Sequence, residues 1–265
     1  MLPFGVTTVE FALVTFVSAL VGILVAIGAS RYIRSSVIAA FALGIYLWYF
    51  TDTLGDANYL GVNSGPAASA ELYSLVVLFV IGVIAFFALD GSVFSLSEGL
   101  SERRVLVACL AALALGLHGF GEGADFGFTA AQTPTTSLLG AFGGLAEGAS
   151  WALHKLLEPM IAAAIYVALT GGKPRRASER LVDALALTGV FAVPAVVGAA
   201  TGYFVVFDHT YAFALGLGAS TYALGRLGKP LIASGDGAQR WLSFKMALAL
   251  VIGFLLIFLA ALLHS

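Results

Sequence analysis

Two segments of this sequence repeat the pattern His-x-x-x-Glu: His118 with Glu122, and His154 with Glu158. Residues four apart lie on the same face of an α-helix, about 6 Å from each other, so each pair can offer one imidazole nitrogen and one carboxylate to a single ion. Neutral imidazole and carboxylate together suit borderline divalent metals such as zinc. The two pairs therefore predict one metal site with His118, Glu122, His154 and Glu158 as its ligands.

Further carboxylates extend this pattern toward one end of the same segments. Asp125 follows the first histidine by seven residues, and Glu147 precedes the second histidine by seven. We expect this pair to assist entry of the ion. Asp52 and Asp56 lie at the end of an earlier apolar run, and we consider them for the same path by which the ion reaches the site. In contrast, we expect the loop residues Asp208 and His209 to be solvated rather than to bind metal.

One basic residue, Lys155, directly follows the second histidine. Carboxylates that share a site repel each other strongly when no cation is near. We therefore expect Lys155 to act as an electrostatic substitute for a second metal. Two simpler alternatives stay open: the lysine extends its ammonium group to the membrane surface, or the polar residues pair with one another as buried hydrogen bonds.

The composition excludes several classes of protein. Of the 265 residues, 60% are hydrophobic and 11% are charged, whereas soluble domains carry about 25% charged residues. The net charge is -2, so the chain lacks the excess of positive charge with which proteins bind nucleic acid. The single cysteine, Cys109, excludes a disulfide framework and a thiolate zinc site. The chain is therefore predicted to lie in lipid, and a metal site must use His and carboxylates.

Hydrophobic runs of about 20 residues predict transmembrane helices. We expect an all-α, polytopic membrane protein that forms a single domain over residues 1–265, with eight spans. These lie near 8–30, 35–57, 71–90, 104–131, 137–170, 181–204, 211–226 and 241–263.

The basic residues predict the orientation of these spans. Twelve of the thirteen Lys and Arg fall in or beside the connections on one side, and short cytoplasmic connections hold an excess of such residues. Both termini are then extracytoplasmic, in the plasma or inner membrane. By helical rise, the four ligands lie about 18 to about 27 Å from the cytoplasmic ends of their spans, near the middle of the bilayer.

The segments that hold these residues resemble the ZIP family of divalent metal transporters. Residues 118–127 are similar to the family's span 4 signature, and His154-Lys155-Leu156-Leu157-Glu158 to its span 5 signature. Residues 191–203 look like its sixth span, and 50–57 like a diverged second span. The resemblance implies eight spans in a 3+2+3 inverted-repeat bundle. A faint repeat of Phe-Ala-Leu-Gly at 41–44 and 213–216 agrees with it.

The sequence also departs from the family pattern. Gly119, Gly121, Leu157 and Pro159 replace residues that are usual in the family, which implies a distant member. In members with two bound metals, the residues after the two histidines contribute to the second site. Because these are Gly119 and Lys155 here, we predict that one metal binds.

These observations favour a secondary transporter that moves divalent metal into the cytoplasm and is not an enzyme. Zinc is the favoured substrate, with iron(II), manganese, cobalt and cadmium as competitors, and no organic cofactor is expected. The expected partners are the ion and membrane lipid, with a homodimer considered and no nucleic acid. The alternatives are an intramembrane zinc-dependent hydrolase and a metal sensor that binds without flux.

Overall fold

The computed structural model describes residues 4–56, 69–96, 100–132, 138–170, 176–206, 208–233 and 243–264. All regular elements in these ranges are helices, which confirms the all-α prediction. They are α1 (Phe4–Ala29), α2 (Ser35–Asp56), α3 (Ser69–Leu96), α4 (Leu100–Gln132), α5 (Leu138–Ala141), α6 (Leu145–Leu157), α7 (Pro159–Thr170), α8 (Ala177–Phe204), α9 (Thr210–Ala233), α10 (Phe244–Ala261) and the 3-10 turn η2 (Leu262–His264).

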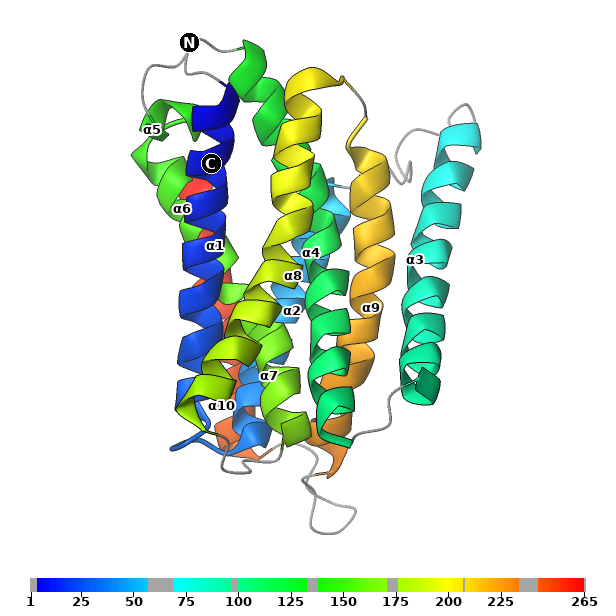
Figure 1. The fold of residues 1–265 in the computed structure, drawn as a ribbon, viewed down its shortest axis with the longest axis vertical. Helices are drawn as coiled ribbons and strands as arrows, with labels where there is room; N and C mark the ends of the chain where they lie inside the picture. The colour runs from blue at the N-terminus through cyan, green and yellow to red at the C-terminus, as the bar shows by residue number, and fades with distance from the viewer. Residues whose placement is uncertain are drawn as a thin grey trace.

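The long helices alternate in direction along one bundle (Figure 1). We call the end at which α1 begins and α4 finishes the upper end, as it is drawn. Helices α1, α3, α6 with α7, and α9 run downward, and α2, α4, α8 and α10 run upward. Helix α3 lies at the edge of the bundle, where α9 is its main neighbour.

The outer surface of the bundle is apolar. On α1, a stripe of aliphatic side chains recurs every fourth residue and is between 43% and 58% exposed: Val9, Leu13, Val17, Val21 and Val25. A soluble helix turns such a face toward the core. An outward-facing stripe of this kind matches a lipid environment.

Seven helical stretches in the described ranges are long and apolar enough to cross a membrane: Phe4–Ala29, Ser35–Gly55, Tyr73–Gly91, Arg104–Gln132, Leu145–Thr170, Ala177–Phe204 and Phe244–Ala261. The expected span at 211–226 corresponds to α9, which is not among them. Several helices are thus long and apolar enough to span a membrane, as the composition predicts.

Helices α4 and α8 pack closely because glycines line their interface. A Cβ atom built on Gly123 would collide with the backbone carbonyl of Ala195, and one on Gly198 would collide with the carbonyl of Phe120. Small residues allow such close approach between helices in a membrane. This contact fixes the position of α4, which carries the first His-x-x-x-Glu pair.

The expected span at 137–170 is not one continuous helix. Helix α6 ends at Leu157, and α7 begins at Pro159, with Glu158 in a turn between them. Proline has no N–H, so it cannot bond to the carbonyl of Lys155 four residues before it. The chain therefore changes from one helix to the next at a proposed metal ligand.

Below the middle of the bundle, small side chains fill the core. Alanines with 0% exposure come from α2, α4, α7, α8 and α9, among them Ala39, Ala108, Ala111, Ala162, Ala163, Ala184 and Ala219. On α4, Ala108 and Ala111 lie between the lower end of the helix and His118, and on α7, Ala162 and Ala163 follow Glu158 toward the lower end. The lower half of the bundle is therefore tightly packed.

Candidate metal centre

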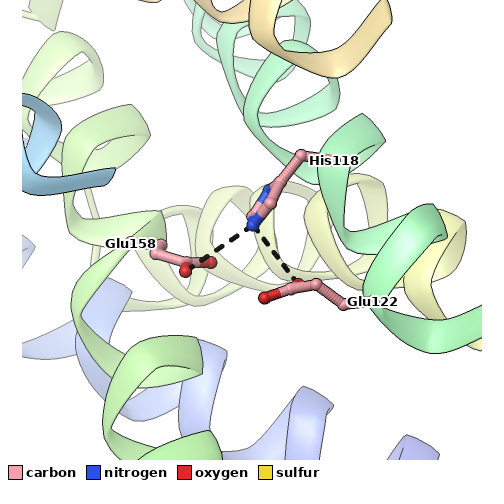
Figure 2. Close-up of side chains that lie close together, drawn as sticks. All are labelled: His118, Glu122 and Glu158. Carbon is pink, nitrogen blue, oxygen red and sulfur yellow. Dashed lines mark ion pairs between the residues drawn. The ribbon is translucent and has the colours of Figure 1, made fainter. Parts of the chain in front are cut away.

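Three of the four predicted ligands lie together: His118 and Glu122 on α4, and Glu158 between α6 and α7 (Figure 2). Their ligand atoms are all within 4.8 Å of one another. The His118 Nε2 atom is 3.3 Å from Glu122 Oε2 and 3.8 Å from Glu158 Oε1. Among the described residues, this is the one group of three or more His, Cys, Asp and Glu side chains arranged so closely. We call these residues the triad.

The orientation of His118 determines what its ring offers to the triad. Its Nδ1 lies 2.9 Å from the carbonyl oxygen of Leu115. A carbonyl only accepts hydrogen bonds, so Nδ1 carries the proton and donates it. In the neutral ring, Nε2 then has a lone pair that faces two carboxylates. Lone pairs and negative oxygens repel, so this arrangement calls for either a proton on Nε2 or a metal cation between them. A backbone carbonyl that fixes the tautomer in this way is typical of histidine ligands to metals.

Two neighbours hold this ring in place. The Tyr49 ring on α2 meets it edge-on, with 4.6 Å between centroids, and the Tyr49 hydroxyl donates to the same Leu115 carbonyl at 3.3 Å. On the other side, Gly216 of α9 lies against the His118 backbone. A Cβ atom built on Gly216 would be 2.7 Å from the His118 Cα. Only glycine allows α9 to lie this close to α4 at this residue.

Lys155 lies inside the triad and does not extend to the membrane surface. Its Nζ donates to Glu158 Oε2 at 2.9 Å and to Glu122 Oε2. The residue is 1% exposed, and its ammonium group also lies over the rings of Trp151 and Phe191, at 4.8 Å and 5.9 Å from their centroids. Two carboxylates and one ammonium give the cluster one net negative charge when His118 is neutral.

The Glu158 carboxylate divides its two oxygens between these partners. Oε2 accepts from Lys155, whereas Oε1 faces His118 Nε2. Glu158 is 3% exposed, whereas the Glu122 side chain is 21% exposed. Glu158 Oε1 is thus available to a metal ion beside His118. Glu122 is the more exposed of the two carboxylates, so an arriving ion would meet it first.

The fourth predicted ligand, His154, is not part of this group. Its Nδ1 lies 2.9 Å from the carbonyl oxygen of Ser150, one turn earlier on α6. Its Nε2 is buried and has no hydrogen-bond partner among the described residues. The helical turn between them is intact, because the Glu158 N–H donates to the His154 carbonyl at 2.9 Å and Glu158 keeps helical backbone angles. The ring of His154 is instead directed toward Ser150, away from the triad.

A cavity of about 660 Å³ lies above the triad. Glu122 of the triad lines the lower end of the cavity. Gly55, Thr129 and Gly143 line its upper end, near the upper ends of the helices. Three carboxylates assigned to the pathway line it, namely Asp52, Asp125 and Glu147, together with His154. The side chain of Asp56 lies outside the described part of the chain. The carboxylates expected at an entrance thus share one cavity with a triad residue.

The sequence patterns did not identify every polar group of this cavity. His209 lines it from the start of α9, together with Phe213. It was expected to be solvated, because a loop histidine outside any helical pattern carries no signal of its neighbours. Tyr49 likewise gave no signal, since an aromatic residue in an apolar span is indistinguishable there from a core residue.

The triad supplies one nitrogen and carboxylate oxygens from two residues, a donor set that suits zinc and related divalent ions. No family model matches the chain, and no curated protein matches it.

Proposed function

We propose that this protein is a ZIP-like secondary transporter that carries divalent transition metal ions, zinc foremost, into the cytoplasm through the triad. The observation that carries this proposal is the buried His118 Nε2, which faces two carboxylates at the foot of an acidic cavity. Iron(II), manganese, cobalt and cadmium are competing substrates, because nitrogen and oxygen ligands bind all of them.

The cost of placing these groups in a membrane supports a functional role. A charged side chain at the centre of a bilayer costs at least about 2.5 kcal/mol. His118 and Glu122 lie in the stretch Arg104–Gln132, and Lys155 and Glu158 lie in Leu145–Thr170, both of which are long and apolar enough to span one. Groups of this kind persist where they bind an ion or line its path.

Lys155 supports binding of a single ion. Its ammonium group already neutralises one carboxylate charge and lies where a second metal would need room. A divalent ion in the triad would convert the net charge of the cluster from -1 to +1, given the two carboxylates and the lysine. A second divalent ion would leave a large uncompensated charge in a low-dielectric region, which is unfavourable.

The distribution of basic residues supports the direction of transport. In the proposed arrangement, α9 is the eighth span, the bundle has the 3+2+3 inverted repeat of the family, and both termini are extracytoplasmic. The connections at the lower end, which hold the Lys and Arg excess, then face the cytoplasm. The cavity opens toward the outside, while buried alanines close the cytoplasmic half. Transport requires the opposite state as well, in which the lower half opens and the cavity closes.

Uptake of radioactive zinc into liposomes that contain the purified protein tests this function. Wild-type protein should give saturable uptake, and His118→Ala and Glu122→Gln should abolish it. Glu179→Gln is the matched control, because Glu179 is exposed at the start of α8. Saturable zinc binding without uptake by wild-type protein would refute transport and favour a sensor.

One observation favours an enzyme as the second candidate. Three protein ligands with a fourth position open to a cavity are typical of catalytic zinc sites, where the metal activates a bound water. An intramembrane hydrolase would release a product from a lipid or peptide substrate in a metal-dependent manner. Product release by protein that shows no uptake would select this alternative.

A further inference from the structure

A buried carboxylate lies in the tightly packed lower half of the bundle. Asp183 is 9% exposed and belongs to the stretch Ala177–Phe204, which is long and apolar enough to span a membrane. Its Oδ2 accepts a hydrogen bond from the hydroxyl of Tyr166 on α7, with 2.6 Å between the two oxygens. A carboxylate is costly to bury in an apolar span, and such groups mark the paths of ions. The triad and the cavity above it do not account for Asp183, because it belongs to neither.

Helices α7 and α8 connect this pair to the triad. On α7, Tyr166 follows Glu158 by eight residues. On α8, Asp183 precedes Phe191 by eight residues, and the Phe191 ring lies at the triad, with its centroid 5.9 Å from Lys155 Nζ. Residues eight apart share one side of a helix and lie about 12 Å apart along its axis. The hydrogen bond between Tyr166 and Asp183 therefore lies about two turns below the triad, toward the lower end.

Apolar side chains separate the pair from the triad. Ala162 lies midway along α7 between Glu158 and Tyr166, Leu187 lies at the matching place on α8, and both are 0% exposed. In this state the Asp183 carboxylate is closed off from the triad, and Tyr166 occupies one of its oxygens. A state in which the lower half opens would remove this separation. Asp183 would then be a carboxylate within reach of an ion that moves from the triad toward the lower end.

We propose that Asp183 is an exit ligand, whose carboxylate receives the divalent metal ion as the ion leaves the triad, and that Tyr166 holds this carboxylate while the lower half is closed. A hydroxyl donor satisfies a buried carboxylate without adding a competing charge. One carboxylate binds a metal more weakly than three ligands do, which suits a late site on a transport path, since the ion must leave it. This inference rests on the proposed transport function and adds a site on the side of the triad opposite the cavity.

Zinc uptake into liposomes by two variants of the full-length protein separates a ligand from a structural hydrogen bond. Asp183→Asn keeps an oxygen that can accept from Tyr166 but loses the charge that attracts the ion, so the maximal rate of uptake should fall at least about tenfold. Tyr166→Phe removes the hydrogen bond but keeps the carboxylate, so the rate should stay within about twofold of wild type. Glu179→Gln and Tyr32→Phe are the matched controls, because both residues are exposed and lie at the lower end.

A substituted ligand gives a second measurement, which a purely structural role would not change. Thiolate favours zinc, whereas carboxylate suits manganese, so Asp183→Cys should raise the ratio of zinc uptake to manganese uptake, and Glu179→Cys should leave it at the wild-type value. Thermal unfolding in detergent identifies any variant that has lost its fold. Normal zinc uptake by Asp183→Asn, or an unchanged ratio in Asp183→Cys, would overturn the exit ligand while uptake by wild-type protein still supported transport. If wild-type protein gives no uptake, the proposed function itself fails.

Discussion

Lys155 Nζ donates to Glu158 Oε2 at 2.9 Å in a region where both residues are almost completely buried. The two residues are three apart in sequence: Lys155 lies in the last turn of α6, and Glu158 lies between α6 and α7. This ion pair means that the triad contains a cation before any metal arrives. A metal ion therefore uses the carboxylate oxygens that the lysine does not saturate, and the predictions below depend on that division.

The first prediction concerns the two carboxylates of the triad. Glu122→Ala and Glu158→Ala should each weaken zinc binding by more than about tenfold, or about 1.4 kcal/mol, because each removes a negatively charged ligand that faces His118 Nε2. Calorimetric titration of the tight site measures the change. Glu179→Ala is the control, and unchanged affinity in both triad variants would refute the assignment.

The second prediction concerns the lysine. Lys155→Ala leaves two carboxylates in one buried cluster without their shared cation. The more negative cluster should take up either a second divalent ion or a proton, and proton uptake would make transport more sensitive to acid. Lys155→Glu should add a ligand for the second ion. Native mass spectrometry and uptake across a pH series provide the two measurements. A Lys155→Ala protein with unchanged stoichiometry and an unchanged pH profile would contradict this role.

The convergence of His118, Glu122 and Glu158 could be predicted from the sequence because it depends on two regular quantities. Helical periodicity places His118 and Glu122 on one face. Helical rise places Glu158 at a similar depth on an antiparallel neighbour. The all-α fold followed as directly from the hydrophobic runs, although α9 is not among the described helices that are long and apolar enough to cross a membrane.

The position of the His154 imidazole could not be predicted in the same way, because it depends on the direction in which the ring points and not on helical periodicity. Periodicity places His154 and Glu158 on one face, and the Glu158 N–H does donate to the His154 carbonyl at 2.9 Å. The Ser150 carbonyl then fixes the imidazole. The place of His209 on the cavity wall was equally inaccessible, since His209 precedes α9 and lies outside any helical pattern.

The third prediction concerns entry through the cavity. Replacement of both Asp125 and Glu147 by neutral amides should raise the apparent KM for zinc uptake, because fewer negative charges then line the cavity above the triad. Equilibrium affinity of the tight site should stay within about twofold of wild type, since neither residue belongs to the triad. Uptake kinetics and calorimetry give the two values. Weakened equilibrium binding with an unchanged KM would contradict an entrance role.

The fourth prediction uses the contact between α9 and the His118 backbone. Gly216→Ala places a methyl group where the His118 Cα and Cβ leave no room, at 2.7 Å and 2.9 Å from the new carbon. The two helices must separate, at a cost of about 1 to 3 kcal/mol, and His118 must shift relative to Glu158, which should weaken zinc binding about tenfold. Gly228→Ala, on the same helix, is the matched control, because nothing lies within 4 Å of its built Cβ. Thermal unfolding and zinc titration of both variants in detergent measure these effects. If Gly216→Ala matched Gly228→Ala in stability and affinity, the close contact of α9 with α4 would not be what positions His118.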